Sequence, residues 1–172
     1  MKFFNLEARI ALVTGASRGL GRAIAESLAQ AGATVVLAAR DAGKLHEVAD
    51  GIRAAGGCAE VEAFDLLDEA AVEAVVPRIV RRLGRLDILV NNAGICIWGP
   101  LFESSMDVWR RTLDTNLTAV YLLAREAARP MVEQRWGRII NISSYVAAIG
   151  REPKNGSYPS AARAGGGVGR PF

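Results

Sequence analysis

The sequence has few of the residues that build metal centres or disulfide frameworks. Only two of its 172 residues are cysteine, Cys58 and Cys96, and the single histidine is His46. The cysteines form no CxxC pair and have no histidine cluster beside them, so a zinc site or a secreted disulfide scaffold is not expected and a reducing compartment is favoured. No apolar run approaches the roughly 20 residues of a membrane span, and the amino terminus lacks a signal-peptide core. We therefore expect a soluble, cytoplasmic protein without a metal.

The sequence also lacks a concentrated positive charge. Lys and Arg number 21 against 18 Asp and Glu, and 18 of the 21 are arginine. Arg78, Arg81, Arg82 and Arg85 stand close together, but no aromatic residues interleave them, whereas a nucleic-acid interface gathers its cations into a stripe. We interpret this group as the solvated face of a helix and expect no nucleic-acid partner.

What the chain does contain is a regular alternation of short β-type runs with helical periodicity. The runs that read as strands cover residues 10–14, 34–39, 61–64, 86–91 and 138–143. This alternation is typical of a parallel sheet with helices on both faces. It predicts one α/β domain over residues 1–172, doubly wound and of the Rossmann type, with an irregular glycine-rich tail at 165–172.

The helical stretches carry apolar stripes at intervals of three or four residues. The first stripe comprises Leu20, Ile24, Leu28 and Ala31. In a later helix Pro77 predicts a kink or a late start. The fourth helix is expected to open at Ser104 with Asp107 in capping-box spacing, and its inner face to carry Trp109, Leu113, Leu117, Val120 and Ala124.

A glycine-rich turn joins the first strand directly to a helix. It reads Thr14-Gly15-Ala16-Ser17-Arg18-Gly19-Leu20-Gly21. Glycines in such a turn let the N–H groups at the positive helix end approach a pyrophosphate without a Cβ in the way. The same turn also serves as a plain connection, so other loops must decide between the two interpretations.

Polar residues follow the later strands at their carboxyl ends, where an open α/β sheet binds its ligand. They are Asp65, the segment Asn91-Asn92-Ala93-Gly94, and Ser143-Ser144. Singly, each has an ordinary structural explanation: a helix cap, a turn and a loop serine. Their location on one edge of one sheet favours a ligand site.

With these motifs and with Asn116 and Tyr158, the chain resembles the short-chain dehydrogenase/reductase family. The motifs follow the order of the family from residue 6 to about 165. Within the domain, residues 1–158 are the well-matched part. The resemblance implies an NAD(P)-dependent oxidoreductase acting on a small carbonyl or alcohol substrate. It implies a general acid/base at Tyr158, a serine at Ser144 that orients the substrate oxygen, and Asn116 holding a water in the proton path. The implied cofactor-binding residues are Gly15, Ser17, Arg18, Gly19, Leu20, Gly21, Arg40, Asp65, Asn91, Ala93 and Gly94.

Asn116 also has support from its own position. It sits between Leu113 and Leu117 on an apolar stripe, where an amide must find hydrogen-bond partners. The alternative is a core asparagine satisfied by backbone groups.

Charge at the end of the second strand bears on the choice of cofactor. The ribose 2′-hydroxyl of NAD(H) is bound by a carboxylate at this place, whereas the 2′-phosphate of NADP(H) is bound by guanidinium groups. The strand ends Ala39-Arg40, and Arg18 stands in the glycine turn, so NADP(H) is preferred and NAD(H) is the alternative. Asp41 opposes this preference, unless it caps the next helix or pairs with Arg40.

The sequence departs from the family in two respects. The family has a lysine four residues after the tyrosine, where this chain has Ala162; Arg163 is one residue too late, and Lys154 lies in the preceding loop. The last strands of the family are also missing, which predicts a truncated chain with an exposed sheet edge that forms homo-oligomers if it folds. The alternative to an active enzyme is therefore a catalytically impaired nucleotide-binding fragment or pseudo-enzyme.

Overall fold

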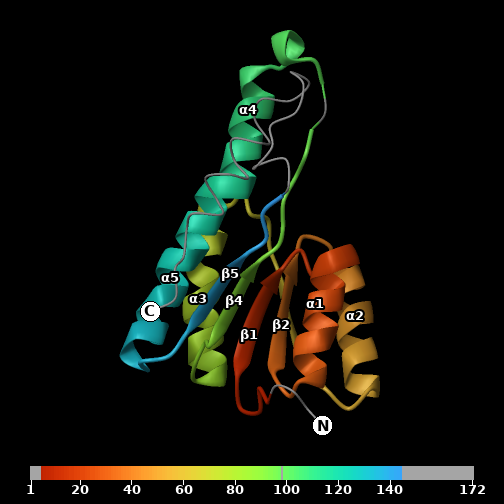
Figure 1. Ribbon diagram of the computed structural model, residues 1–172, viewed down its shortest axis with the longest axis vertical. Helices are drawn as coiled ribbons and strands as arrows, with labels where there is room; N and C mark the ends of the chain where they lie inside the picture. Colours follow the sequence, from red (N-terminus) through yellow and green to blue (C-terminus); the bar gives the residue numbers. More distant parts are fainter. Residues whose placement is uncertain (1–4, 98, 145–172) are drawn as a thin grey trace.

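The computed structural model describes residues 5–97 and 99–144, in which five parallel strands form one sheet of order β3-β2-β1-β4-β5 (Figure 1). The strands are β1 Ile10–Thr14, β2 Thr34–Ala39, β3 Cys58–Ala63, β4 Ile88–Asn91 and β5 Arg138–Asn141. All four strand pairs are parallel. The predicted Rossmann-type fold is confirmed.

Helices cover both faces of the sheet. They are α1 Gly19–Gln30, α2 Ala42–Ala54, α3 Glu69–Leu83, a 3-10 turn Leu101–Glu103, α4 Met106–Leu113, a π-helical segment Asp114–Thr118 and α5 Ala119–Glu133. One core lies between the sheet and α1 and α2, the other between the sheet and α3 and α5. α4 extends past the carboxyl-terminal edge of the sheet (Figure 1). No described helix is long and apolar enough to cross a membrane.

The strands alternate their side chains between these two cores. In β1, Leu12 packs with α3 and α5 while Val13 packs with α1 and α2, and Val36 and Leu37 do the same in β2. All four are fully buried. Because both faces are covered, the central strands are continuously apolar, which made β1 and β2 easy to recognise from the sequence.

The edge strand β3 begins three residues before the predicted run 61–64. Glu60 and Glu62 alternate with apolar residues in it, so it lacks the continuous apolar run of β1 and β2. Glu62 is nearly buried and accepts ion pairs from Arg78 at 3.0 Å and from Arg82 at 2.8 Å, while Arg82 also lies 3.6 Å from Glu60. An edge strand has only one neighbouring strand, and here arginines of α3 complete its surroundings.

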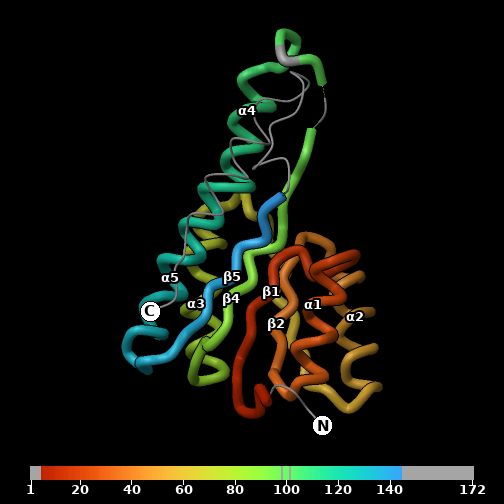
Figure 2. Tube along the Cα trace, viewed as in Figure 1, coloured from red at the N-terminus to blue at the C-terminus, as the bar shows by residue number. Residues whose placement is uncertain are grey.

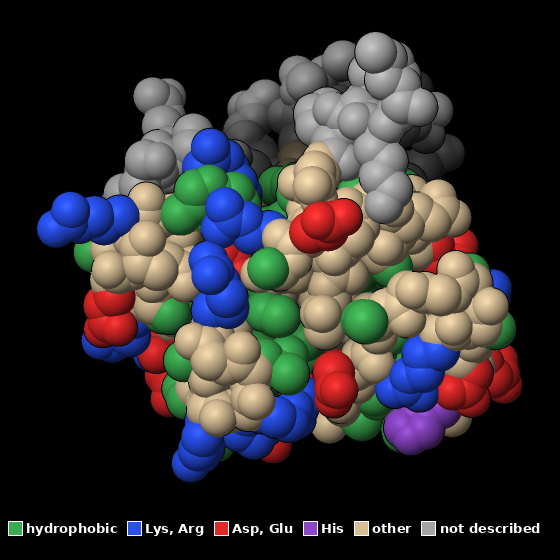
Figure 3. Space-filling model, turned by 90° about the horizontal axis from the view of Figure 1, so that it is seen from below, with side chains coloured by type: hydrophobic (Ala, Val, Ile, Leu, Met, Phe, Trp, Pro, Cys, Tyr) green, Lys and Arg blue, Asp and Glu red, His purple; other side chains and the backbone are tan. Residues whose placement is uncertain are grey.

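These ion pairs refine the expectation of a solvated arginine face. Two of the four grouped arginines are engaged with β3, and Arg85 is engaged with Asp87. Seen from the amino-terminal ends of the strands, basic side chains gather on the surface with acidic side chains beside them (Figure 3). The basic groups therefore serve mainly to neutralise carboxylates of the same chain.

The first apolar stripe is confirmed at Ile24 and Leu28, which pack against the core of α1 and α2, but it is wrong at Leu20. Leu20 is 58% exposed, whereas Gly21, Ala25 and Ala29 are the buried residues of α1. Small side chains on this stripe allow the helix to lie close to the sheet. Leu20 instead faces the carboxyl-terminal edge, where it lines a cavity.

Two other helix predictions need correction. α4 is capped by Ser105, not Ser104: the Ser105 Oγ accepts a hydrogen bond from the Val108 N–H at 3.2 Å. α3 begins at Glu69 and continues through Pro77, so its start is not delayed.

The predicted fourth helix is divided by the π-helical segment into α4 and α5. The extra residue in the π turn rotates the apolar stripe between the two parts. Of the residues predicted for the inner face, Trp109 in α4 is 36% exposed, whereas Val120 and Ala124 in α5 are buried.

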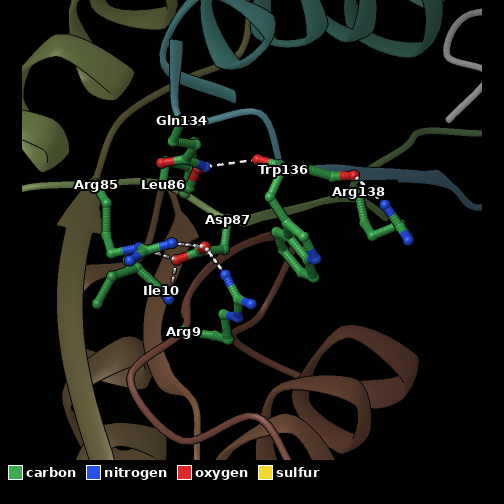
Figure 4. Close-up of polar contacts among 9 residues, drawn as sticks. Arg9, Ile10, Arg85, Leu86, Asp87, Gln134, Trp136 and Arg138 are labelled. Carbon is green, nitrogen blue, oxygen red and sulfur yellow. Dashed lines mark hydrogen bonds and ion pairs between the residues drawn. The ribbon is translucent and has the colours of Figure 1, made fainter. Parts of the chain in front are cut away.

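A buried carboxylate ties the amino-terminal ends of β1 and β4 together (Figure 4). Asp87 is fully buried and accepts hydrogen bonds from Arg9 Nη1 at 2.9 Å, the Ile10 N–H at 2.9 Å, and Arg85 Nε and Nη2 at 2.8 and 2.6 Å. The Arg9 guanidinium stacks 3.9 Å from the ring centroid of Trp136, which precedes β5. The cluster thus joins three segments at the sheet edge opposite the predicted site.

The strand order places the topological switch point between β1 and β4, whose ends lie next to each other (Figure 2). The chain runs from β1 outward to β3 on one side and from β4 to β5 on the other. In the described part of the chain β5 is the last strand on its side, and Ile140 and Ile142 are 45% and 39% exposed there. The switch point predicts where a ligand binds.

Candidate active site

A cavity of about 750 Å³ opens at the carboxyl-terminal edge of the sheet, over the switch point. Its walls come from the β1–α1 turn, the start of α2, the loop after β3, the loop after β4, and α4 with the π segment. It contains ten of the predicted cofactor-binding residues: Gly15, Ser17, Arg18, Gly19, Leu20, Gly21, Arg40, Asp65, Ala93 and Gly94. Among the described residues, Asn91, Asn116 and Ser144 do not line it.

The glycine turn is packed so closely that side chains are excluded at two of its positions. Gly15 has φ +67°, and a Cβ there would lie 2.8 Å from Asn92 Nδ2. A Cβ on Gly21 would overlap the Gly15 carbonyl oxygen and Asn92 Nδ2. At Gly19, with φ +57°, a Cβ would meet nothing within 4 Å, so the turn is open on that side.

Helix α1 begins without a side-chain cap. Its N-cap residue is Arg18, whose side chain makes no capping hydrogen bond, whereas Asp41, Asp68 and Ser105 cap α2, α3 and α4. The first N–H groups of α1 therefore carry the positive end of the helix dipole toward the cavity. With the Arg18 guanidinium beside them, these groups fit the diphosphate of a dinucleotide.

Thr14 and Asn92 hold the loops of β1 and β4 against each other. The Thr14 Oγ1 accepts hydrogen bonds from the N–H groups of Asn92 and Ala93 at 3.0 and 3.1 Å. Asn92 Nδ2 donates to the Thr14 carbonyl at 3.0 Å. The Asn-Asn-Ala-Gly segment thus fixes the shape of the glycine turn, and Asn92 matters to the site although it was not among the predicted site residues.

Asn91 does not line the cavity but lies beside Asn141 of the neighbouring strand β5. It is 3% exposed, and its Nδ2 donates to Asn141 Oδ1 at 2.9 Å. Its own Oδ1 is buried and has no hydrogen-bond partner among the residues that the structure describes. In this structure Asn91 links β4 to β5 and makes no part of the cavity wall.

The wall formed by β2 and α2 carries both signs of charge. Arg40 Nη1 lies 3.9 Å from Asp65 Oδ2. Asp41 caps α2, accepting from the Lys44 N–H at 3.1 Å, and the Lys44 Nζ lies 3.3 Å from its second oxygen. The pKa of Asp41 is lowered, chiefly by the backbone N–H of Lys44. Of the two arrangements considered for Asp41, the helix cap is the one found.

Lys44 is a cavity residue that sequence reasoning missed. It follows the cap residue Asp41 by three residues, in the first turn of α2, and this spacing was the available signal. Arg111 and Thr115 were missed as well, since the π turn that directs Thr115 inward leaves no mark in the periodicity.

Asn116 lies in the π-helical segment and binds the backbone of Ile95 on both sides. Its Oδ1 accepts from the Ile95 N–H at 2.8 Å, and its Nδ2 donates to the Ile95 carbonyl at 2.7 Å. A Cβ on Gly94 would lie 3.3 Å from the same Oδ1. Both polar atoms of the Asn116 side chain thus bond to backbone groups, and the residue fixes the loop that follows β4.

Ser144 follows β5 by three residues and is partly buried at the same edge of the sheet. Tyr158 lies outside the described residues, as do Lys154, Ala162 and Arg163. The structure therefore brings the glycine turn, the β4 loop and Asn116 together at one edge, and the role of Tyr158 rests on sequence.

Comparison with known proteins identifies the family. A family model described as short chain dehydrogenase matches residues 9–167. The 3-oxoacyl-(acyl-carrier-protein) reductase FabG of Vibrio harveyi is 42% identical over 146 residues, which make up 85% of this chain and 59% of the relative. Gluconate 5-dehydrogenase of Gluconobacter oxydans is 42% identical over 148 residues, 86% of this chain and 58% of the relative. The chain thus spans less than two thirds of the length of these curated relatives.

Solved structures agree with this assignment. A metagenomic short-chain oxidoreductase in complex with NADP superposes with a TM-score of 0.90 at 42% identity, over 95% of this chain and 74% of that one. A putative NAD(P)-dependent gluconate 5-dehydrogenase from Beutenbergia cavernae, with NADP bound at low occupancy, superposes with a TM-score of 0.88 at 39% identity, over 94% and 64%. The chain belongs to the short-chain dehydrogenase family.

Proposed function

We propose that the protein is an NAD(P)-dependent oxidoreductase that prefers NADP(H) and interconverts a small carbonyl compound and its alcohol. The observation that carries this proposal is the start of α1, which has no side-chain cap and borders the cavity. The glycine turn before it has open space beside Gly19. A helix end with free N–H groups and a neighbouring arginine is suited to a diphosphate. The adjoining wall supplies Arg40 for the far end of a dinucleotide.

The proposed chemistry divides between the cofactor and the chain. The nicotinamide, when bound, supplies or accepts the hydride. In reduction the Tyr158 hydroxyl gives its proton to the substrate oxygen while Ser144 orients that oxygen; in oxidation Tyr158 takes the proton. Asn116 retains one amide proton and one oxygen lone pair beyond its contacts with Ile95, which is enough to hold a water in the proton path.

A second candidate function is cofactor binding without turnover. A tyrosine has a pKa near 10 and needs a nearby cation to act as a base at neutral pH. Ala162 stands where the family has its lysine, four residues after Tyr158. This departure affects the acid–base step, whereas the described cavity keeps the glycine turn and Arg40 for cofactor binding.

The decisive experiment combines cofactor titration with a turnover assay. Binding is followed by NADPH fluorescence, and turnover is measured with keto sugars, 3-oxoacyl thioesters and steroid ketones. The first two classes correspond to the reactions named for gluconate 5-dehydrogenase and FabG. Turnover with any of them supports the enzyme, and binding without turnover across the panel supports the second candidate. Absence of binding to either nicotinamide dinucleotide contradicts both, and turnover that survives Tyr158→Phe contradicts the role proposed for Tyr158.

Cofactor preference is tested by charge reversal at Arg40. Arg40→Asp is expected to lower the ratio of NADP(H) to NAD(H) affinity by at least about tenfold, because a guanidinium that can bind the 2′-phosphate becomes a carboxylate suited to the ribose hydroxyls. The ratio is obtained from calorimetric Kd values for both dinucleotides. Arg53→Asp, at the opposite end of α2, is the matched control and should leave the ratio unchanged. An unchanged ratio in Arg40→Asp would show that this strand end does not select the cofactor.

A further inference from the structure

Lys44 lies on the same cavity wall as Arg40, in the first turn of α2, and its only described ionic partner is Asp41. The side chains of Lys44 and Asp41 are 55% and 50% exposed, so water screens their attraction. Exposed ion pairs of this kind contribute little to stability. Lys44 can therefore leave Asp41 at little cost when a more highly charged anion enters.

The two partners of this pair differ in mobility. One Asp41 oxygen accepts the Lys44 N–H, a bond that also caps the helix, so the carboxylate is held by the backbone. The Lys44 ammonium stands at the end of a four-carbon chain with several rotatable bonds. The ammonium can move toward a ligand, whereas the carboxylate stays in place.

The charges on this wall show what Lys44 adds. Four cations line the cavity: Arg111 comes from α4, whereas Arg18, Arg40 and Lys44 follow β1 and β2 together with the carboxylate Asp41, and the carboxylate Asp65 follows β3. Arg40 is already near Asp65, at 3.9 Å. Without Arg111, these five groups carry a net charge of one positive with Lys44 and are neutral without it. A phosphate monoester carries close to two negative charges at neutral pH, so Lys44 strengthens the attraction of this end of the cavity for it.

We propose that Lys44 is a third cation for the 2′-phosphate of NADP(H), and that Asp41 is the counter-ion it leaves when the phosphate binds. This inference rests on the proposed preference for NADP(H). It assigns Lys44 a role in specificity, because the 2′-hydroxyl of NAD(H) carries no charge for the ammonium to bind. It also assigns Asp41 two roles, as the cap of α2 and as the counter-ion of Lys44. An uncharged cap at this position would keep the first role and remove the second.

The test measures binding by calorimetry with adenosine 2′,5′-bisphosphate and 5′-AMP, which carry no nicotinamide, and with NADP⁺ and NAD⁺. Lys44→Gln is expected to weaken the bisphosphate and NADP⁺ about fivefold and to leave 5′-AMP and NAD⁺ unchanged. Asp41→Asn is expected to strengthen the bisphosphate about threefold, since asparagine caps helices as well as aspartate does. Both effects should shrink as salt is added.

Matched substitutions on the same helix provide the controls. Arg53→Gln removes a positive charge from the last turn of α2, and Asp50→Asn removes an exposed negative charge. Neither should change the ratio of bisphosphate to 5′-AMP affinity. Thermal unfolding of Asp41→Asn should match the wild type, which confirms that the cap is retained.

The outcomes separate this inference from the proposed function. If the wild type prefers NADP⁺ and Lys44→Gln keeps the same preference, the role of Lys44 is wrong and the proposed function stands. If Asp41→Asn weakens the bisphosphate while its unfolding is unchanged, Asp41 is not a competing counter-ion. If the wild type binds neither dinucleotide, the inference and the proposed function both fail.

Discussion

Replacement of Gly21 by alanine is expected to weaken binding of NADP(H) at least about 100-fold. The added methyl group would overlap the Gly15 carbonyl oxygen and Asn92 Nδ2. Neither atom can retreat alone, because Gly15 belongs to the turn and Asn92 Nδ2 donates to the Thr14 carbonyl. The turn itself must move, and with it the N–H groups that face the cavity. Overpacking of this kind also costs about 1–3 kcal/mol of stability.

Gly51→Ala is the matched control for Gly21→Ala. Gly51 also lies in a helix, α2, but a Cβ there would meet nothing within 4 Å. Alanine is the better helix former, so the variant should gain about 0.5–1 kcal/mol of stability and bind the cofactor normally. Fluorescence titration and urea unfolding of both variants measure the two effects. Wild-type binding by Gly21→Ala would contradict the requirement for a glycine where α1 packs against the turn.

Replacement of Asp87 by asparagine is expected to destabilise the protein by about 3 kcal/mol. The carboxylate is fully buried and accepts bonds from Arg9, Ile10 and Arg85 (Figure 4). The amide cannot neutralise the two guanidinium groups, and its NH₂ would face other donors. Removing one member of a buried ion pair is costly for this reason. Urea unfolding at pH 7 measures the loss, and Asp50→Asn, at an exposed position, should change little.

The contribution of Asp87 should depend on pH in a defined direction. Burial alone would raise the pKa of Asp87, but hydrogen bonds from Arg85, the Ile10 N–H and Arg9 outweigh burial and lower it. A folded-state pKa below the unfolded value of about 3.9 means that the stabilisation is present above that pH and is lost as pH falls through the folded pKa. The difference in unfolding free energy between wild type and Asp87→Asn should therefore be constant near neutrality and narrow below about pH 4. A difference that does not narrow in acid would contradict the ionised state of Asp87.

The strands that were recognised best are those buried on both faces. β1 and β2 have the predicted bounds because strands buried between two helical layers are nearly continuous apolar runs. β3 was recognised only in part, because Glu62 is buried with arginines that lie 16 and 20 residues later in the chain. A partner at that distance cannot be identified from local periodicity.

In the candidate site, too, the sequence predicted some residues correctly and missed others. The glycine turn and Asp65 could be placed on the cavity from the sequence, because carboxyl ends of parallel strands meet at one edge. Asn91 was assigned to the cofactor with its neighbours, but alternation along β4 places it on the same face of the sheet as Leu89, where it bonds to Asn141. Thr115 lines the cavity because of a π turn that the periodicity does not show, whereas Lys44 was missed although it follows the helix cap Asp41 by three residues.

The sequence by itself determined the fold class, the edge of the sheet that holds the site, and the family, because these depend on local patterns of apolar residues and on glycine and polar motifs at the carboxyl ends of several strands. Only the tertiary structure decided which polar groups share a wall and which carboxylate neutralises which cation. Electrostatic pairing depends on distances of a few ångströms between segments far apart in the chain, and those distances exist only after the layers have packed.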